Sequence, residues 1–97
     1  MTSKVIYKGA LRTEVTHLRT GNTIITDAPL DNKGKGQAFS PTDLVATALA
    51  SCMLTIMGIK ADEMKINIEG ASAEVKKIMA SSPRRISQVK VVINIPV

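Results

Sequence analysis

The sequence predicts an α+β fold in which an antiparallel sheet packs against one long buried helix. A strongly apolar helical run occupies residues 40–57, and short strand-like segments lie both before and after it. Strands that gather on either side of one helix, without alternating strand and helix units, are typical of antiparallel α+β folds. The chain has 97 residues, the length of one domain, so we expect residues 1–97 to form a single domain.

The start of the helix is well marked. Ser40 suits the N-cap because its hydroxyl can accept a backbone N–H of the first turn, and Pro41 suits the first helical position. Asp43 follows Ser40 by three residues, which is the acidic position of a capping box, and its charge favours the positive end of the helix dipole.

The helix is too apolar for a surface element. Apolar residues recur at spacings of three and four, at Leu44, Val45, Ala48, Leu49, Cys52, Ile56 and Ile59. A second stripe is small, at Thr47, Ser51, Thr55 and Gly58, and would let another backbone approach closely. We therefore expect the helix to lie between its own sheet and another structural element, for which a second copy of the chain is one candidate. Residues 44–59 are fewer than the ~20 that a bilayer requires, so we expect no membrane span.

The strands are predicted from alternation and turn residues. Before the helix we expect strands over residues 4–9, 11–20 and 23–26, with turns at Gly9-Ala10 and Gly21-Asn22. Residues 27–39 form the irregular loop that leads to the helix. After the helix we expect strand-like pieces over 65–79, interrupted at Gly70, then a turn over 81–85 and a strand over 89–95.

Composition narrows the class of protein. The net charge is +5, but the basic residues are scattered and aromatic residues are 2% of the chain, which argues against nucleic-acid binding. One cysteine excludes an internal disulfide, and the N-terminal residues lack the pattern of a secretory signal, so we expect a cytoplasmic protein. With one cysteine and one histidine, His17, we expect no zinc site and no bound cofactor.

Cys52 is the leading candidate for chemistry. A free cysteine often packs as a small hydrophobe, and this alternative stays open. Cys52 lies too far from the start of the helix for the helix dipole to activate it, so a reactive thiolate needs a nearby cation. Arg12, in the middle of a predicted strand, can hold a thiolate or a peroxide oxygen. Asp43 and Glu14 are carboxylates that could orient Arg12, although surface or capping roles are the ordinary ones. A dyad of Cys52 with His17 lacks an evident orienting residue.

Four segments are informative when taken together. They are Tyr7-Lys8-Gly9-Ala10-Leu11-Arg12, Ile24-Ile25-Thr26-Asp27-Ala28-Pro29, Gly34-Lys35-Gly36, and the block from Ser40 to Leu44 continued by Ala48 to Met53. These segments resemble the OsmC/Ohr family, the osmotically induced and organic-hydroperoxide-resistance proteins, and its OsmC-like branch in particular. The resemblance implies an α+β intertwined homodimer with long central helices between two sheets. It also implies a thiol peroxidase that reduces organic hydroperoxides, and hydrogen peroxide as a second substrate, through a cysteine sulfenic acid, with an external thiol or dithiol as reductant.

By position, Cys52 matches the first, peroxidatic cysteine of the family, and Arg12 matches the family arginine. The glutamate that holds this arginine in Ohr proteins aligns with Thr42, and its neighbour Asp43 is the expected substitute. The family's second cysteine belongs to a later helix, so we expect the family domain to continue beyond Val97. If no second cysteine exists, the alternative is a non-catalytic OsmC-like dimer that binds a ligand or senses redox state through Cys52.

Overall fold

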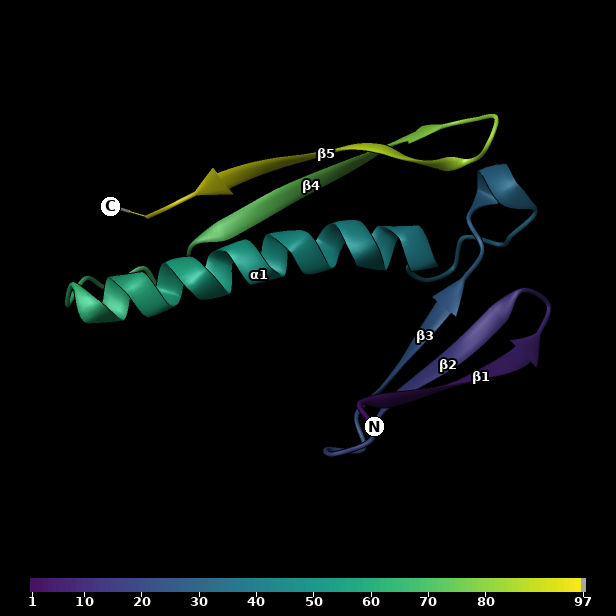
Figure 1. The fold of residues 1–97 in the computed structure, drawn as a ribbon, viewed down its shortest axis with the longest axis horizontal. Helices are drawn as coiled ribbons and strands as arrows, with labels where there is room; N and C mark the ends of the chain where they lie inside the picture. The colour runs from purple at the N-terminus through teal and green to yellow at the C-terminus, as the bar shows by residue number, and fades with distance from the viewer. Residues whose placement is uncertain (97) are drawn as a thin grey trace. The chain divides into compact units, whose positions relative to one another are not determined.

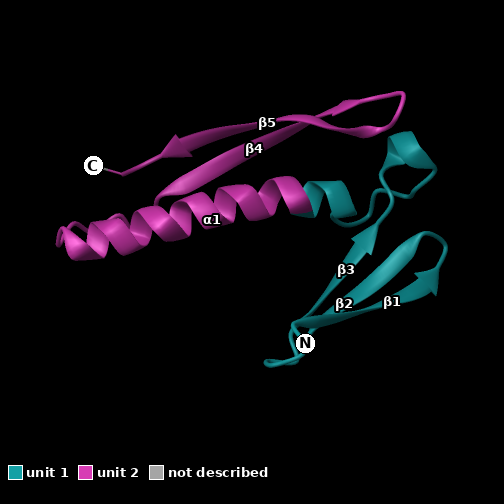
Figure 2. Ribbon diagram, in the orientation of Figure 1, with its two compact units in different colours: residues 1–44 teal, residues 45–97 magenta. Residues whose placement is uncertain are grey.

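The computed structural model describes residues 1–96 and confirms the α+β class. The elements follow in the order β1 (Ser3–Gly9), β2 (Arg12–His17), β3 (Thr23–Asp27), the short 3-10 helix η1 (Leu30–Asn32), α1 (Pro41–Glu63), β4 (Ser72–Ala80) and β5 (Arg85–Asn94) (Figure 1). The chain forms two compact units, residues 1–44 and residues 45 onward, with the boundary inside α1 (Figure 2). The expectation of a single domain stays a prediction.

The first unit is a three-stranded antiparallel sheet in the order β1-β2-β3. The turn from β1 to β2 contains Ala10 and Leu11, both with left-handed backbone angles (φ 54° and 61°). Two consecutive left-handed residues match the twist of a tight hairpin, which usually places Asn-Gly there. The turn predicted at Gly9-Ala10 is therefore present, shifted by one residue.

The hairpin between β2 and β3 differs from the sequence prediction. The predicted strand over residues 11–20 ends instead at His17, and no two-residue turn forms at Gly21-Asn22. The His17 N–H donates to the Asn22 carbonyl (2.8 Å) and the Gly21 N–H donates to the His17 carbonyl (2.8 Å), so residues 18–21 form the loop. The Thr20 hydroxyl bonds His17 Nδ1 (2.7 Å) and accepts the Asn22 N–H (3.3 Å). These local side-chain bonds compete with strand pairing and end the ladder early.

The helix α1 begins where the sequence predicts and runs for 23 residues to Glu63. The capping box is confirmed, because Ser40 Oγ accepts the Asp43 N–H and Asp43 Oδ2 accepts the Ser40 N–H, each at 3.0 Å. Of the apolar residues of the helix, the chain by itself buries Ala46, Ala50 and Ala61. The helix is thus covered along one side in the single chain, while the sequence predicts burial all round.

In the second unit the β4–β5 hairpin runs along α1 (Figure 1). Its side chains alternate: Ala73, Val75, Val89, Val91 and Ile93 are partly buried, whereas Glu74, Lys76, Lys90 and Val92 are exposed. The first strand-like piece predicted after the helix, around residues 66–69, is instead an irregular connection, and β4 begins at Ser72. Its Asn67 side chain accepts the Glu69 N–H (2.8 Å), a local bond that favours a turn over a strand.

The 23 residues of α1 exceed the ~20 that a bilayer requires, whereas the apolar run over residues 44–59 does not. By length and composition alone, α1 could cross a membrane, and no other helix of residues 1–96 passes that test. The core helix of a soluble protein passes it as well. The expectation of no membrane span therefore depends on the fold around the helix and not on its length.

Candidate active site

Arg12 and Asp27 are direct cross-strand partners. The β2–β3 register pairs their Cα atoms, so both side chains project from the same face of the sheet. One nitrogen of the guanidinium, Nη2, donates to Asp27 Oδ2 at 3.3 Å. The sheet thus gives Arg12 a fixed carboxylate partner without help from the helix.

Gln37, from the loop before α1, joins this pair. Its side-chain Oε1 accepts a hydrogen bond from Arg12 Nη2 (3.0 Å), and its backbone N–H donates to Asp27 Oδ2 (3.0 Å). Each of the three residues therefore bonds the other two. We call this arrangement the Arg12 cluster.

Burial within the Arg12 cluster is uneven. Asp27 is 1% exposed, whereas the Arg12 side chain is 35% exposed. The Gln37 N–H holds the pKa of Asp27 below its ordinary value, Arg12 and the positive charge of Lys35 act in the same direction, and burial opposes them. A carboxylate that stays ionised while buried requires its cation nearby. Arg12 Nη2 is therefore held at Asp27, while the rest of the guanidinium stays partly exposed.

The chain immediately before Arg12 is strained. Ala10 and Leu11 hold left-handed angles without being glycine, which costs of order 1 kcal/mol for each residue. The Leu11 carbonyl accepts the Ala28 N–H (3.1 Å) and so links this turn to the segment that follows Asp27. Strain of this kind, next to a partly exposed cation, favours a functional position.

Asp43 lies at the start of α1, in the same unit as Arg12, and is engaged in the capping box with Ser40. Its proposed role as the residue that orients Arg12 stays a prediction. The carboxylate that the structure joins to Arg12 is Asp27.

Cys52 lies on α1, in the second unit, as a free and exposed cysteine. Four large apolar residues occupy the same side of the helix, at successive spacings of 4, 3, 4 and 3 with Cys52 in the middle: Val45, Leu49, Ile56 and Ile59. Their exposed fractions lie between 48% and 61%. We call these five residues the Cys52 stripe. The thiol thus stands in an apolar surface that the chain by itself leaves open.

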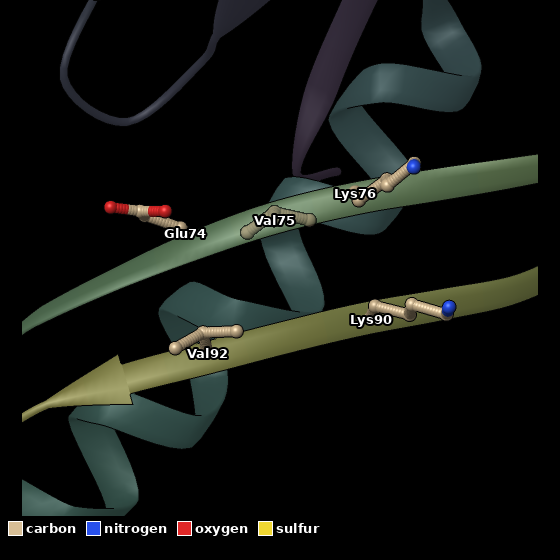
Figure 3. A pocket seen from close by; sticks show the side chains of 5 residues that line it. All are labelled: Glu74, Val75, Lys76, Lys90 and Val92. Atoms are coloured by element: carbon tan, nitrogen blue, oxygen red, sulfur yellow. The ribbon is translucent and has the colours of Figure 1, made fainter.

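Two hollows of the second unit lie away from the thiol. One, of about 320 Å³, is lined by α1 and β4 residues that do not include Cys52, namely Thr47, Ala50, Ser51, Leu54, Thr55, Ala73 and Val75. The other, of about 290 Å³, lies on the hairpin and is lined by Glu74, Val75, Lys76, Lys90 and Val92 (Figure 3). Neither is lined by a cysteine or histidine. Within residues 1–96, no group of three or more His, Cys, Asp or Glu side chains could hold a metal ion.

Sequence reasoning missed Asp27 and Gln37. The signal for Asp27 was available in principle, because the hairpin register decides which residue faces Arg12. A two-residue turn at Gly21-Asn22 would pair Arg12 with Asp31, whereas the observed register pairs it with Asp27. Gln37 lies in an irregular loop, and no periodic pattern of the sequence places its side chain.

The fold and the matches to known proteins define an α+β protein of the OsmC type. The family model for OsmC-like proteins matches residues 34–97, more than half of the chain. A similar crystal structure is that of a Psychrobacter arcticus 273-4 protein, provisionally named an osmotic stress induced and detoxification response protein. The two sequences are 63% identical, the TM-score is 0.95, and the match covers 98% of this chain and 69% of that one. Curated proteins give no match. This chain belongs to the OsmC family.

Proposed function

We propose that the protein is a thiol-dependent peroxidase that reduces organic hydroperoxides. Cys52 is the nucleophile, Arg12 is the cation that stabilises the thiolate and the developing charge on oxygen, and an external dithiol is the reductant. The observation that carries this proposal is the exposed thiol at the centre of the apolar Cys52 stripe, in a chain of the OsmC family. The name of the Psychrobacter arcticus protein, which refers to detoxification, is consistent with it.

The proposed reaction involves the Cys52 thiolate, the hydroperoxide and the external dithiol. The Cys52 thiolate attacks the distal oxygen of R–O–O–H; an S–O bond forms as the O–O bond breaks. The electron pair of that bond leaves with the alkoxide, which takes a proton and departs as ROH. The sulfur becomes a sulfenic acid, the reversible first step of thiol oxidation. The dithiol then reduces the sulfenic acid, releasing water, restoring the thiol and leaving as a disulfide.

Arg12 supports this chemistry through its free donors. Its hydrogen bonds to described residues use Nη2, so Nε and Nη1 make none within residues 1–96. An arginine keeps its charge when water is excluded and presents its donors in a planar fork, which suits a thiolate or a peroxide oxygen.

The working form that we propose is a homodimer. The 4-3-4-3 spacing of the Cys52 stripe is that of a helix-pairing seam. Its four large apolar residues are 48–61% exposed in the chain alone, with Leu49 the least exposed. Within residues 1–96, the buried apolar residues of the chain by itself are three alanines, too little to stabilise a domain of this length. Pairing through the stripe would cover the apolar surface and enclose Cys52 in a site suited to an organic substrate.

The experiment is to treat the protein with one equivalent of an organic hydroperoxide in the presence of a sulfenate-trapping reagent, and to follow labelling by mass spectrometry. We expect rapid, stoichiometric labelling of Cys52, none in Cys52→Ser, and a loss of about 10²- to 10³-fold in rate for Arg12→Ala. Arg19→Ala is the matched control, because Arg19 is an exposed arginine of the same unit. Labelling no faster than that of an ordinary thiol would refute peroxidase chemistry and favour a binding or redox-sensing OsmC-like protein.

A further inference from the structure

We propose that Asp27 is a positioning residue for Arg12. Gln37, from the loop over residues 28–39, helps to hold Arg12 in the same position. This inference rests on the proposed function, because it assigns a task to residues that support Arg12. Asp27 would not touch the substrate. It would act by fixing where the guanidinium stands when the thiolate forms.

The three residues of the Arg12 cluster form a closed set of hydrogen bonds. Asp27 Oδ2 accepts from both Arg12 Nη2 (3.3 Å) and the Gln37 backbone (3.0 Å), and Gln37 Oε1 accepts from Arg12 Nη2 (3.0 Å). A single guanidinium nitrogen is therefore held from two directions by two different segments of the chain. The opposite side of the guanidinium is left with its donors available.

Moving Arg12 away from Asp27 would be energetically unfavourable. Asp27 is 1% exposed, and its Oδ1 atom already has no hydrogen-bond partner within residues 1–96. If Arg12 left, the ionised carboxylate would stay buried without its cation, and removing one partner of a buried pair in this way is strongly unfavourable. The buried carboxylate thus restricts the position of a side chain that would otherwise be free to move in solvent.

Backbone hydrogen bonds anchor the loop over residues 28–39. The Asp27 N–H donates to the Phe39 carbonyl (3.0 Å), and the Gly36 N–H donates to the Ala28 carbonyl (3.1 Å). At Gly34 an added Cβ would lie 1.7 Å from the Ala28 carbonyl oxygen, so the two loop segments are in direct contact. Gln37 is therefore presented to Arg12 by a loop that is closed at its ends and packed within itself.

The experiment compares rates of Cys52 sulfenate formation in wild type, Asp27→Asn and Gln37→Ala, over a range of pH. We expect Asp27→Asn to slow the reaction by roughly 10- to 100-fold, because a small misplacement of a catalytic group has effects of that size. Gln37→Ala should slow it several-fold. Adding Gln37→Glu to Asp27→Asn returns a carboxylate to Arg12 and should recover most of the rate. Glu69→Gln, which removes one exposed carboxylate, is the matched control.

Two further readouts keep the outcomes distinct. The side-chain NMR signals of Arg12, assigned with Arg12→Lys, should show a hindered guanidinium in wild type and a freely rotating one in Asp27→Asn. Circular dichroism reports whether each variant folds, and if Asp27→Asn does not, the exposed Gln37→Ala carries the test. Wild-type rates in folded variants would overturn the inference and leave the proposed function standing. A wild-type protein that reacts only as an ordinary thiol would overturn both.

Discussion

Replacing Leu49 by lysine should dissociate the proposed dimer. Leu49 belongs to the Cys52 stripe and is 48% exposed in the single chain. That fraction leaves roughly 90 Å² accessible, and covering it is worth about 2 kcal/mol at ~25 cal/mol/Å². A symmetric pair contains two copies, so about 4 kcal/mol is lost, or ~10³-fold in the dissociation constant. The charge of the new lysine adds to this loss, because it would have to be desolvated.

The assay is sedimentation equilibrium over a dilution series, with the dissociation constant as the readout. Met64→Lys is the matched control, because Met64 is 57% exposed, lies just beyond α1 and does not belong to the stripe. We expect this control to dissociate like the wild type. Equal dissociation constants for wild type and Leu49→Lys, or a stably folded wild-type monomer, would refute helix pairing through the stripe.

The other predictions concern stability, each measured by urea unfolding. Ser40→Ala removes half of the capping box and should lower the free energy of unfolding by about 1 kcal/mol; Ser40→Asn, which restores a capping acceptor, should recover most of it. Because the pKa of Asp27 is lowered in the folded protein, its ionised form stabilises the native state above the ordinary value of 3.8, and this contribution is lost as the pH falls below that value. Wild type should therefore lose more stability than Asp27→Asn between about pH 6 and pH 3, and parallel losses would contradict the direction of the shift. Gly34→Ala places a methyl group against Ala28 and should destabilise by about 1–3 kcal/mol, whereas Gly58→Ala, with open space around it, should stabilise α1 by up to ~1 kcal/mol. A neutral or stabilising effect of Gly34→Ala would show that its contact with Ala28 is not tight.

The helix could be predicted from sequence because its signals are local. The hydroxyl of Ser40, the ring of Pro41 and the carboxylate of Asp43 act within one turn, and the structure contains the cap that they predict. The degree of burial could not be predicted in the same way. An apolar surface all round a helix indicates that something covers it, but within residues 1–96 the buried residues of α1 lie on one side, at Ala46, Ala50 and Ala61.

The Arg12 cluster could be predicted only in part. Arg12 could be named as a candidate because a reactive Cys52 needs a nearby cation and because Arg12 matches the arginine of the family by position. Its partner depends on the hairpin register, which the Thr20 side chain changes by ending β2 early, at His17. Gln37 depends on the path of an irregular loop, and that path is set by contacts such as Gly34 against Ala28, which no periodic pattern encodes.

Because its ends are joined, the loop over residues 28–39 should tolerate inserted residues. The loop leaves β3 at Asp27 and returns to it at Phe39, where a backbone hydrogen bond (3.0 Å) joins its ends. Lengthening a loop whose ends are already joined costs little, since the entropy of closure grows only with the logarithm of length. Insertions at the exposed residues Asp31 and Asn32 should therefore leave the strand and the helix start in place. This makes the loop tip a suitable point for grafting a reporter peptide or a spectroscopic probe.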